Sequence, residues 1–191
     1  MISYLRSQNW FVLVTLAIIS GALCNVLGDF EIWLPPSMRY VVPFRMIGPI
    51  VPAILVALLL TSKGIQAKRL AVRPVLWIDR AAFALTAVAP ALAYVATAQT
   101  VLALSDLIAL RNFIGLLGIA AISGVVFGRH GQWLLPAAYL FASMVAGIND
   151  QNQPYDWAWV LQPAESPVAF ILSGVFLVSG LLLRELSNRL R

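Results

Sequence analysis

Three polar residues interrupt an otherwise apolar stretch, ALSDLIALRNFIGLLGIAAISGVVFG, at residues 103–128. Asp106, Arg111 and Asn112 can form ion pairs and hydrogen bonds, and Arg45 is a second arginine in apolar surroundings. An arginine at the centre of a bilayer costs about 2.5–3.5 kcal/mol on insertion scales. Two interpretations stay open. Either these side chains snorkel to a membrane surface or form ion pairs, or the four residues shape a substrate path on the outer side of a membrane.

Residues that could carry out catalysis are sparse in this sequence. The single histidine, His130, follows Arg129 and precedes Gly131, a pattern typical of a surface turn, and Cys24 is the single cysteine. The H-E-x-x-H and G-x-S-x-G motifs of metalloproteases and hydrolases do not occur, nor does the G-x-x-x-x-G-K-[ST] loop that holds a nucleotide. We therefore expect no catalytic residues, no metal site and no cofactor.

The composition favours an integral membrane protein. Of the 191 residues 61% are hydrophobic and 11% are charged, and the mean hydropathy is +0.87. Soluble domains average about 25% charged residues, so this chain cannot cover itself with a polar surface. The formal net charge of +5 comes from basic residues that flank apolar runs. They are not interleaved with aromatic residues, so we expect a membrane surface and no nucleic acid as their partner.

Six apolar segments are long enough, or nearly so, to cross a bilayer, which takes about 20 residues. They predict an all-α fold: a polytopic bundle of six transmembrane helices in one domain that covers residues 1–191. The first run is longer than the apolar core of a signal peptide, so we expect it to remain as a span. The predicted spans are 10–28, 41–61, 80–99, 107–127, 132–147 and 167–183.

The charges between the spans predict an orientation. Basic residues should lie on the cytoplasmic side, which places both termini there and predicts the plasma membrane, the inner membrane of a bacterium. The predicted cytoplasmic segments hold Arg6, Lys63, Lys68, Arg69, Arg73, Arg80, Arg129, Arg184, Arg189 and Arg191, against Asp79 and Glu185. The predicted outer segments hold Asp29, Glu31, Asp106, Asp150, Asp156 and Glu165, against Arg39.

Small residues and prolines predict how the spans pack and where one of them bends. Ala138, Ala142 and Ala146 recur every fourth residue, which favours a close helix–helix interface, and glycines recur along 107–127. The segment PFRMIGPIVPAIL in the second span predicts a kink or a break. It is either an ordinary kink or a functional one. The six tryptophans fall near span ends, as in an interfacial aromatic belt.

Two loops have a distinctive composition. Residues 62–79, SKGIQAKRLAVRPVLWID, are the most basic cytoplasmic stretch, and a short interfacial helix is expected at 64–72. Its cations suit either anionic lipids or a cytoplasmic partner. The outer segment INDQNQPYDWAWVLQPAESP is polar at both ends with an apolar centre, so it could return toward the membrane as a short helix.

This arrangement resembles the membrane subunit of an exporter-type ABC transporter of the small six-span kind. The N-terminal MISYLRSQNW matches the family's interfacial segment, the basic loop its coupling helix, and QPYDWAWVLQPAESP its outer re-entrant helices. The resemblance implies a homo- or heterodimer of permeases in membrane lipids, bound to a cytoplasmic ATP-binding subunit that hydrolyses ATP. Lys68, Arg69 and Arg73 would then dock that subunit.

Other classes of function also fit the sequence. The chain could be a non-transporting scaffold or accessory subunit of a larger complex, with the alanine stripe Ala138, Ala142 and Ala146 binding a partner helix. It could also act alone as a channel or carrier, with Arg45 and Arg111 at an anion-attracting mouth. An intramembrane enzyme is the least favoured class because the sequence offers no identifiable nucleophile.

Overall fold

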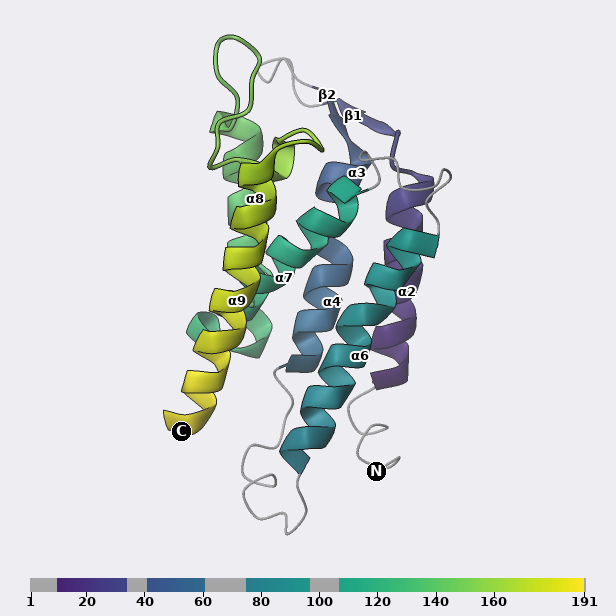
Figure 1. The fold of residues 1–191 in the computed structure, drawn as a ribbon, viewed down its shortest axis with the longest axis vertical. Coiled ribbons are helices and arrows are strands. Elements are labelled where there is room, and N and C mark those ends of the chain that lie inside the picture. The colour runs from purple at the N-terminus through teal and green to yellow at the C-terminus, as the bar shows by residue number, and fades with distance from the viewer. Residues whose placement is uncertain (1–9, 34–40, 61–74, 97–106, 191) are drawn as a thin grey trace.

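The computed structural model describes residues 10–33, 41–60, 75–96 and 107–190 as a bundle of helices that run up and down along its length, with the central one crossing the others obliquely (Figure 1). The predicted coupling helix at 64–72 and the residues Lys68, Arg69, Arg73 and Asp106 lie outside these ranges. The helical elements are α2 (Trp10–Val26), α3 (Phe44–Ile47), α4 (Ile50–Leu60), α6 (Val75–Ala96), α7 (Leu107–Phe127), η2 (Arg129–Gly131), α8 (Leu134–Ala146), η3 (Trp159–Leu161) and α9 (Pro167–Leu190).

A small antiparallel hairpin, which the sequence did not predict, lies between the first two helical segments. Strand β1 (Glu31–Trp33) pairs with β2 (Val41–Pro43) in a register that sets Ile32 opposite Val42. The pair lies at the upper end of the bundle in Figure 1, where α2 ends and α9 begins. We call this end the hairpin end, and the opposite end, where η2 joins α7 to α8, the turn end.

The helices fall close to the six predicted spans. The predicted first, third, fourth, fifth and sixth spans correspond to α2, α6, α7, α8 and α9, and the second corresponds to α3 and α4 together. Helix α9 continues past the predicted end at 183, since the sequence RELSN that follows holds good helix formers. Helix α6 begins five residues before the predicted start at 80.

Length separates these helices into two groups. Leu107–Phe127 and Pro167–Ser187 are long and apolar enough to cross a membrane. The other apolar helical ranges of the described residues are shorter: Phe11–Cys24, Phe44–Leu58 (which runs through α3, Gly48 and Pro49 into α4), Ala87–Ala96 and Leu134–Ala146. The 13 residues of α8 extend about 20 Å at 1.5 Å per residue, less than a hydrocarbon core of about 30 Å.

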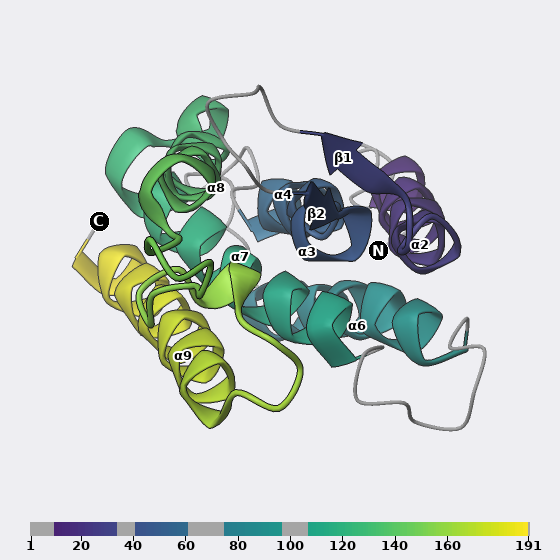
Figure 2. The same ribbon diagram turned by 90° about the horizontal axis from the view of Figure 1, so that it is seen from above.

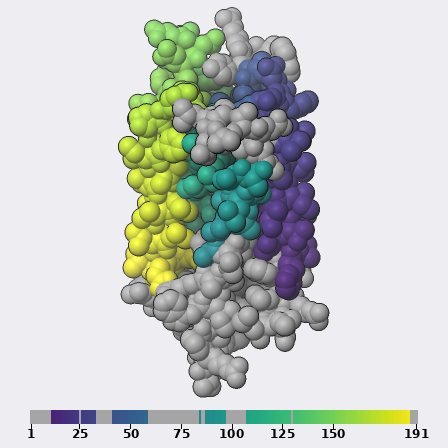
Figure 3. Space-filling model, turned by 45° about the vertical axis from the view of Figure 1, so that its right-hand side comes forward, coloured from purple at the N-terminus to yellow at the C-terminus, as the bar shows by residue number. Residues whose placement is uncertain are grey.

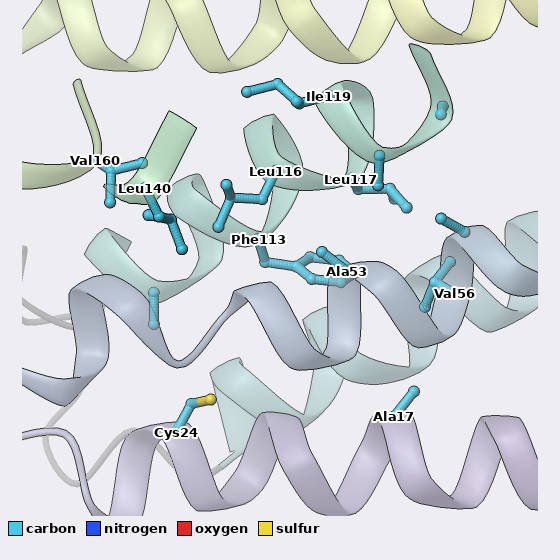
Figure 4. Close-up of a cluster of buried hydrophobic side chains, with 14 of the residues drawn as sticks. Ala17, Cys24, Ala53, Val56, Phe113, Leu116, Leu117, Ile119, Leu140 and Val160 are labelled. Atoms are coloured by element: carbon cyan, nitrogen blue, oxygen red, sulfur yellow. The ribbon is translucent and has the colours of Figure 1, made fainter. Parts of the chain in front are cut away.

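Helix α7 occupies the centre of the bundle. Seen from the hairpin end, it lies among α4, α6, α8 and α9 (Figure 2), and 67% of its apolar window is buried, against 17% for α9. The main core gathers around its residues Phe113, Leu116 and Leu117, with Ala53 and Val56 of α4 facing them (Figure 4).

Glycines allow α7 and α9 to approach closely. A Cβ atom at Gly118 would overlap the backbone of Phe176, and one at Gly180 would overlap the carbonyl oxygen of Gly118. Only a residue without a side chain fits both positions, as in small-residue helix crossings. The prediction that the glycines of 107–127 lie at a helix interface is confirmed for Gly118.

The alanine stripe of α8 faces outward instead. Ala138, Ala142 and Ala146 are all exposed in this chain, as are Phe141 and Val145 beside them. The stripe therefore makes no close helix packing within the described part of the molecule, and any partner helix would have to come from outside it.

Candidate functional site

Arg111 and Asn112 lie in the first turns of α7, near the hairpin end, and both are fully buried. The exposed fraction is 1% for Arg111 and 0% for Asn112. Buried polar side chains are costly unless every group is hydrogen-bonded. Their partners therefore show what the two residues do.

Arg111 binds backbone carbonyl oxygens of the segment between α8 and α9. Its Nη1 donates to the oxygen of Pro163 at 2.9 Å, and its Nη2 donates to those of Gln162 at 2.9 Å and Trp159 at 3.2 Å. The planar guanidinium has five N–H donors in a fixed fork, which suits three acceptors in one short turn. Its Nε donates to Oδ1 of Asn112 at 3.1 Å.

The charge of Arg111 is balanced by dipoles within the described part of the chain. No carboxylate of the described residues forms an ion pair with it, and the Phe170 ring lies 5.6 Å from Cζ, within cation–π range. Arg111 thus reaches neither the molecular surface nor a described carboxylate. Its three bonds to carbonyl oxygens hold the loop that precedes α9 against α7, and its contact with Phe170 reaches the first turn of α9.

Asn112 joins two segments to α7. Its Nδ2 donates to the carbonyl oxygen of Met46 at 3.0 Å and to that of Val160 at 2.9 Å. With Oδ1 accepting from Arg111, every polar atom of the amide has a partner. One side chain therefore ties α3 and η3 to the central helix.

The break that the prolines predict in the second span is present, between α3 and α4. Helix α3 ends at Ile47 and α4 begins at Ile50, with Gly48 and Pro49 between them. Pro49 has no N–H and cannot bond to the carbonyl oxygen four residues earlier. The backbone N–H of Gly48 closes the last turn of α3 on Phe44 at 2.7 Å, and that of Val51 bonds to Gly48 at 3.1 Å.

Trp159 anchors the segment between α8 and α9 in the bundle. Its indole is 0% exposed, stacks on Tyr139 with a centroid distance of 5.5 Å, and fills the space over Gly115, where a Cβ would overlap the ring. The hydroxyl of Tyr139 donates to the carbonyl oxygen of Trp157 at 3.0 Å. An interfacial position was expected for Trp159, but it is a buried core residue.

Trp133 and Trp157 match the expected belt better, with exposed fractions of 53% and 44%. Of the tryptophans whose side chains are described, Trp133 and Trp157 are exposed and Trp159 is buried. The anchored apolar turn Trp159–Leu161 is the short helix that the composition of its loop suggested.

A second, smaller apolar cluster lies at the hairpin end. Its buried members are Val42 of β2 and Ala158 and Leu161 of the anchored segment, and the half-buried Met46, Ile47 and Ile148 pack against them. This cluster joins the hairpin side to the anchored segment, and Met46 and Ile47 also pack against the main core, so the two clusters meet at α3.

Arg45 has partners different from those of Arg111. Its guanidinium forms an ion pair with Asp29, whose side chain is 89% exposed, and its Nε donates to the carbonyl oxygen of Gly28 at 3.3 Å. Exposed pairs of this kind contribute about 0.2–1 kcal/mol. Of the predicted polar patch, the structure brings together Arg111 and Asn112, and Asp106 lies outside the described residues.

Among the described residues, no group of three or more His, Cys, Asp or Glu side chains could hold a metal ion. Sequence reasoning identified Arg111 and Asn112 but missed Trp159 as a core residue and the carbonyl oxygens as ligands of the arginine. The apolar WAWVLQ within a polar loop was the available signal.

Comparison of the chain with models of known families, with curated proteins and with solved structures gives no match in any of the three.

Proposed function

We propose that this chain is the transmembrane permease subunit of an ABC-type exporter, forming the substrate path with a second permease and coupled to separate ATP-binding subunits. In this proposal all six helical segments cross the plasma membrane, with α3 and α4 acting together as one span. ATP hydrolysis is assigned to separate ATP-binding subunits in this proposal, since these 191 residues hold no G-x-x-x-x-G-K-[ST] loop.

Exposed apolar side chains support a membrane environment. Helices α2 and α9 lie on opposite flanks of the bundle, with part of α6 between them (Figure 3). Their exposed residues include Phe11, Leu16 and Ile19 on α2 and Phe170, Ile171, Val175, Val178 and Leu182 on α9. Apolar surface of this extent is unusual for a protein in water and ordinary for one in lipid.

Charge supports the orientation. Acidic residues gather in the segments at the hairpin end: Asp29, Glu31, Asp150, Asp156 and Glu165. The described segments at the turn end carry Arg80, Arg129, Arg184 and Arg189, with Asp79 and Glu185 as acidic neighbours. The positive-inside rule then makes the turn end cytoplasmic and the hairpin end outer, in the inner membrane of a bacterium.

The observation that carries the proposal is the anchored turn between α8 and α9. Trp159–Leu161 returns into the bundle at the hairpin end and is held there by Arg111, Asn112 and the notch over Gly115. It occupies the place in the chain where the exporter family carries outer re-entrant helices. A simple solvated loop at that position would not support the resemblance.

The test is purification of the tagged chain in mild detergent from its native membrane, followed by mass spectrometry. We expect a protein with a Walker nucleotide-binding loop in about equal amount. The triple change Lys68→Glu, Arg69→Glu and Arg73→Glu should remove it, because these cations dock the ATPase in this proposal. The charge-conserving triple Lys68→Arg, Arg69→Lys and Arg73→Lys should retain it. A preparation without such an ATPase contradicts the proposal, and retention by the glutamate triple contradicts the docking site.

A second candidate is a scaffold or accessory subunit of a larger membrane complex. The outward position of Ala138, Ala142 and Ala146 favours it, because small residues on an exposed helix face allow a partner helix to approach closely. A partner without a nucleotide-binding loop in the same purification would select this candidate.

A further inference from the structure

We propose that the membrane is thinner beside α8 than beside α9, because the exposed face of α8 is too short to match a bilayer. Headgroups of the two leaflets would approach each other along the face formed by Leu134, Ala138, Phe141, Ala142 and Val145, all of which are exposed. This inference rests on the proposed function, in which α8 crosses the membrane. It adds which flank of the bundle deforms the surrounding lipid.

The exposed apolar faces of α8 and α9 differ in length. On α9, the apolar range Pro167–Ser187 has 21 residues, which extend about 31 Å at 1.5 Å per residue, and it exposes side chains from Val168 to Leu186. The 13 residues of α8 extend about 20 Å by the same rise. A hydrocarbon core of about 30 Å therefore matches α9 and exceeds the length of α8 by about 10 Å.

Polar groups border this short face at both ends. The exposed His130 precedes α8 at the turn end, and the exposed Asp150 follows it at the hairpin end. The outer segment also returns along the helix, since the hydroxyl of Tyr139 donates to the carbonyl oxygen of Trp157 at 3.0 Å in an exposed hydrogen bond. Tyr139 is the sixth residue of α8, so polar groups of the outer segment lie beside the helix and not only beyond its end.

Contacts with α7 and with the anchored turn fix the depth of α8 in the bundle. The hydroxyl of Ser123, on α7, accepts a hydrogen bond from the backbone N–H of Leu135 at 3.3 Å and donates to the carbonyl oxygen of Gly131 at 2.6 Å. The ring of Tyr139 stacks on the buried indole of Trp159. The helix therefore cannot slide toward either leaflet without breaking these contacts.

A helix that is too short is accommodated by flanking side chains that snorkel, by oligomerisation, or by a thinner bilayer. Snorkelling does not suit the hairpin end, because the side chains of Asn149 and Asp150 are short. Lipid tails conform to an uneven face such as this one, on which Phe141, 68% exposed, stands beside the small Ala138 and Ala142. Lipid is therefore the occupant that we assign to the face, and a polar group that crosses the bilayer meets a shorter apolar path there.

The test attaches a nitroxide spin label to single cysteines and measures its collisions with oxygen, which concentrates in lipid, and with a water-soluble nickel complex. The full chain, with whatever co-purifies, is placed in dioleoyl phosphatidylcholine vesicles, and Cys24→Ala removes the single native cysteine. Phe141→Cys reports on the middle of α8 and Val178→Cys on the middle of α9, where the native side chains are 68% and 56% exposed. Ala142→Cys and Val175→Cys replace them if either variant folds poorly.

We expect the α8 label to lie about 5 Å closer to the headgroups than the α9 label, which is half of the difference between α8 and the hydrocarbon core. Its collisions with the nickel complex, relative to those with oxygen, should be severalfold more frequent. The lipid supplies the matched control. The thinner dimyristoyl bilayer should reduce the difference between the two labels, and the thicker dierucoyl bilayer should increase it.

Equal depths of the two labels, or a difference that does not change with the lipid, would overturn the inference. An α8 label shielded from both reagents would also overturn it, because a protein partner would then cover the face. An α8 label that meets the nickel complex as often as a label in water does would contradict both the inference and the six spans of the proposed function. A shallow α8 label in a preparation without an ATPase would support the thinning and contradict the permease.

Discussion

The side-chain nitrogen of Asn112 lies 3.0 Å from the carbonyl oxygen of Met46 and donates a hydrogen bond to it. The two residues are 66 positions apart in the sequence, and the bond joins the central helix to the segment before the break. The same nitrogen also donates to Val160 at 2.9 Å. One amide therefore holds together the three segments that meet at the hairpin end.

Replacing Asn112 by leucine, which has a similar volume and no donor, should destabilise the chain. The carbonyl oxygens of Met46 and Val160 would lose a buried donor, and each such loss costs about 1–3 kcal/mol. Thermal unfolding of the purified protein in detergent should show a lower midpoint. Gln153→Ala is the control, because this residue is exposed and the change keeps its backbone N–H, which donates to Oδ1 of Asn149. Equal unfolding midpoints for Asn112→Leu and the wild type would show that these two hydrogen bonds do not stabilise the fold.

Replacing Arg111 by lysine should loosen the loop between α8 and α9 although the charge is kept. A single ammonium group cannot reproduce the planar fork that serves Trp159, Gln162 and Pro163. Chymotrypsin, which cleaves after aromatic residues, should then cut faster at the exposed Tyr155 and Trp157. Arg45→Lys, at an exposed ion pair, should not change the cutting rate. A lysine variant as resistant as the wild type would mean that the carbonyl contacts do not fix the loop.

The positions of the helices could be predicted from the sequence because hydropathy acts locally. Each apolar run folds into a helix within its own segment, and a helix satisfies its own backbone groups, which an apolar environment demands. The break at Gly48 and Pro49 could be predicted for the same reason, because the missing N–H is a property of the proline itself and does not depend on distant residues. The hairpin of β1 and β2 was missed because two strands of three residues carry almost no periodic signal.

The contacts of the candidate site could not be predicted, because their partners are backbone atoms. Every residue has a carbonyl group, so nothing in the side chains of Trp159, Gln162 or Pro163 marks them as ligands of Arg111. A carboxylate such as Asp106 is a more recognisable partner in a sequence. The burial of Trp159 depends on the notch over Gly115, which exists only after α7 and the loop come together.

Two glycines of neighbouring helices should respond oppositely to alanine. A Cβ at Gly115 would overlap the indole of Trp159, whereas a Cβ at Gly174 would meet nothing within 4 Å. Gly115→Ala should therefore destabilise the chain by about 1–3 kcal/mol, as overpacking does. Gly174→Ala should be neutral or stabilise it by up to about 1 kcal/mol through helix propensity. Thermal unfolding of both variants, followed by tryptophan fluorescence, measures the difference, and a loss of stability in Gly174→Ala would contradict the open space beside it.

A leucine at Ala142 tests what covers the exposed stripe of α8. The side chain of Ala142 is exposed, so the variant should fold normally, with a change within about 0.5 kcal/mol as at other surface positions. If a partner helix packs closely on the stripe, the larger side chain should release that partner during purification. Ala120→Leu, at a position that is 0% exposed, is the control for damage to the fold itself. Loss of a partner without a nucleotide-binding loop would favour the scaffold. Retention of the full complex with its ATPase would place lipid on this face of α8 and keep the permease as the better explanation.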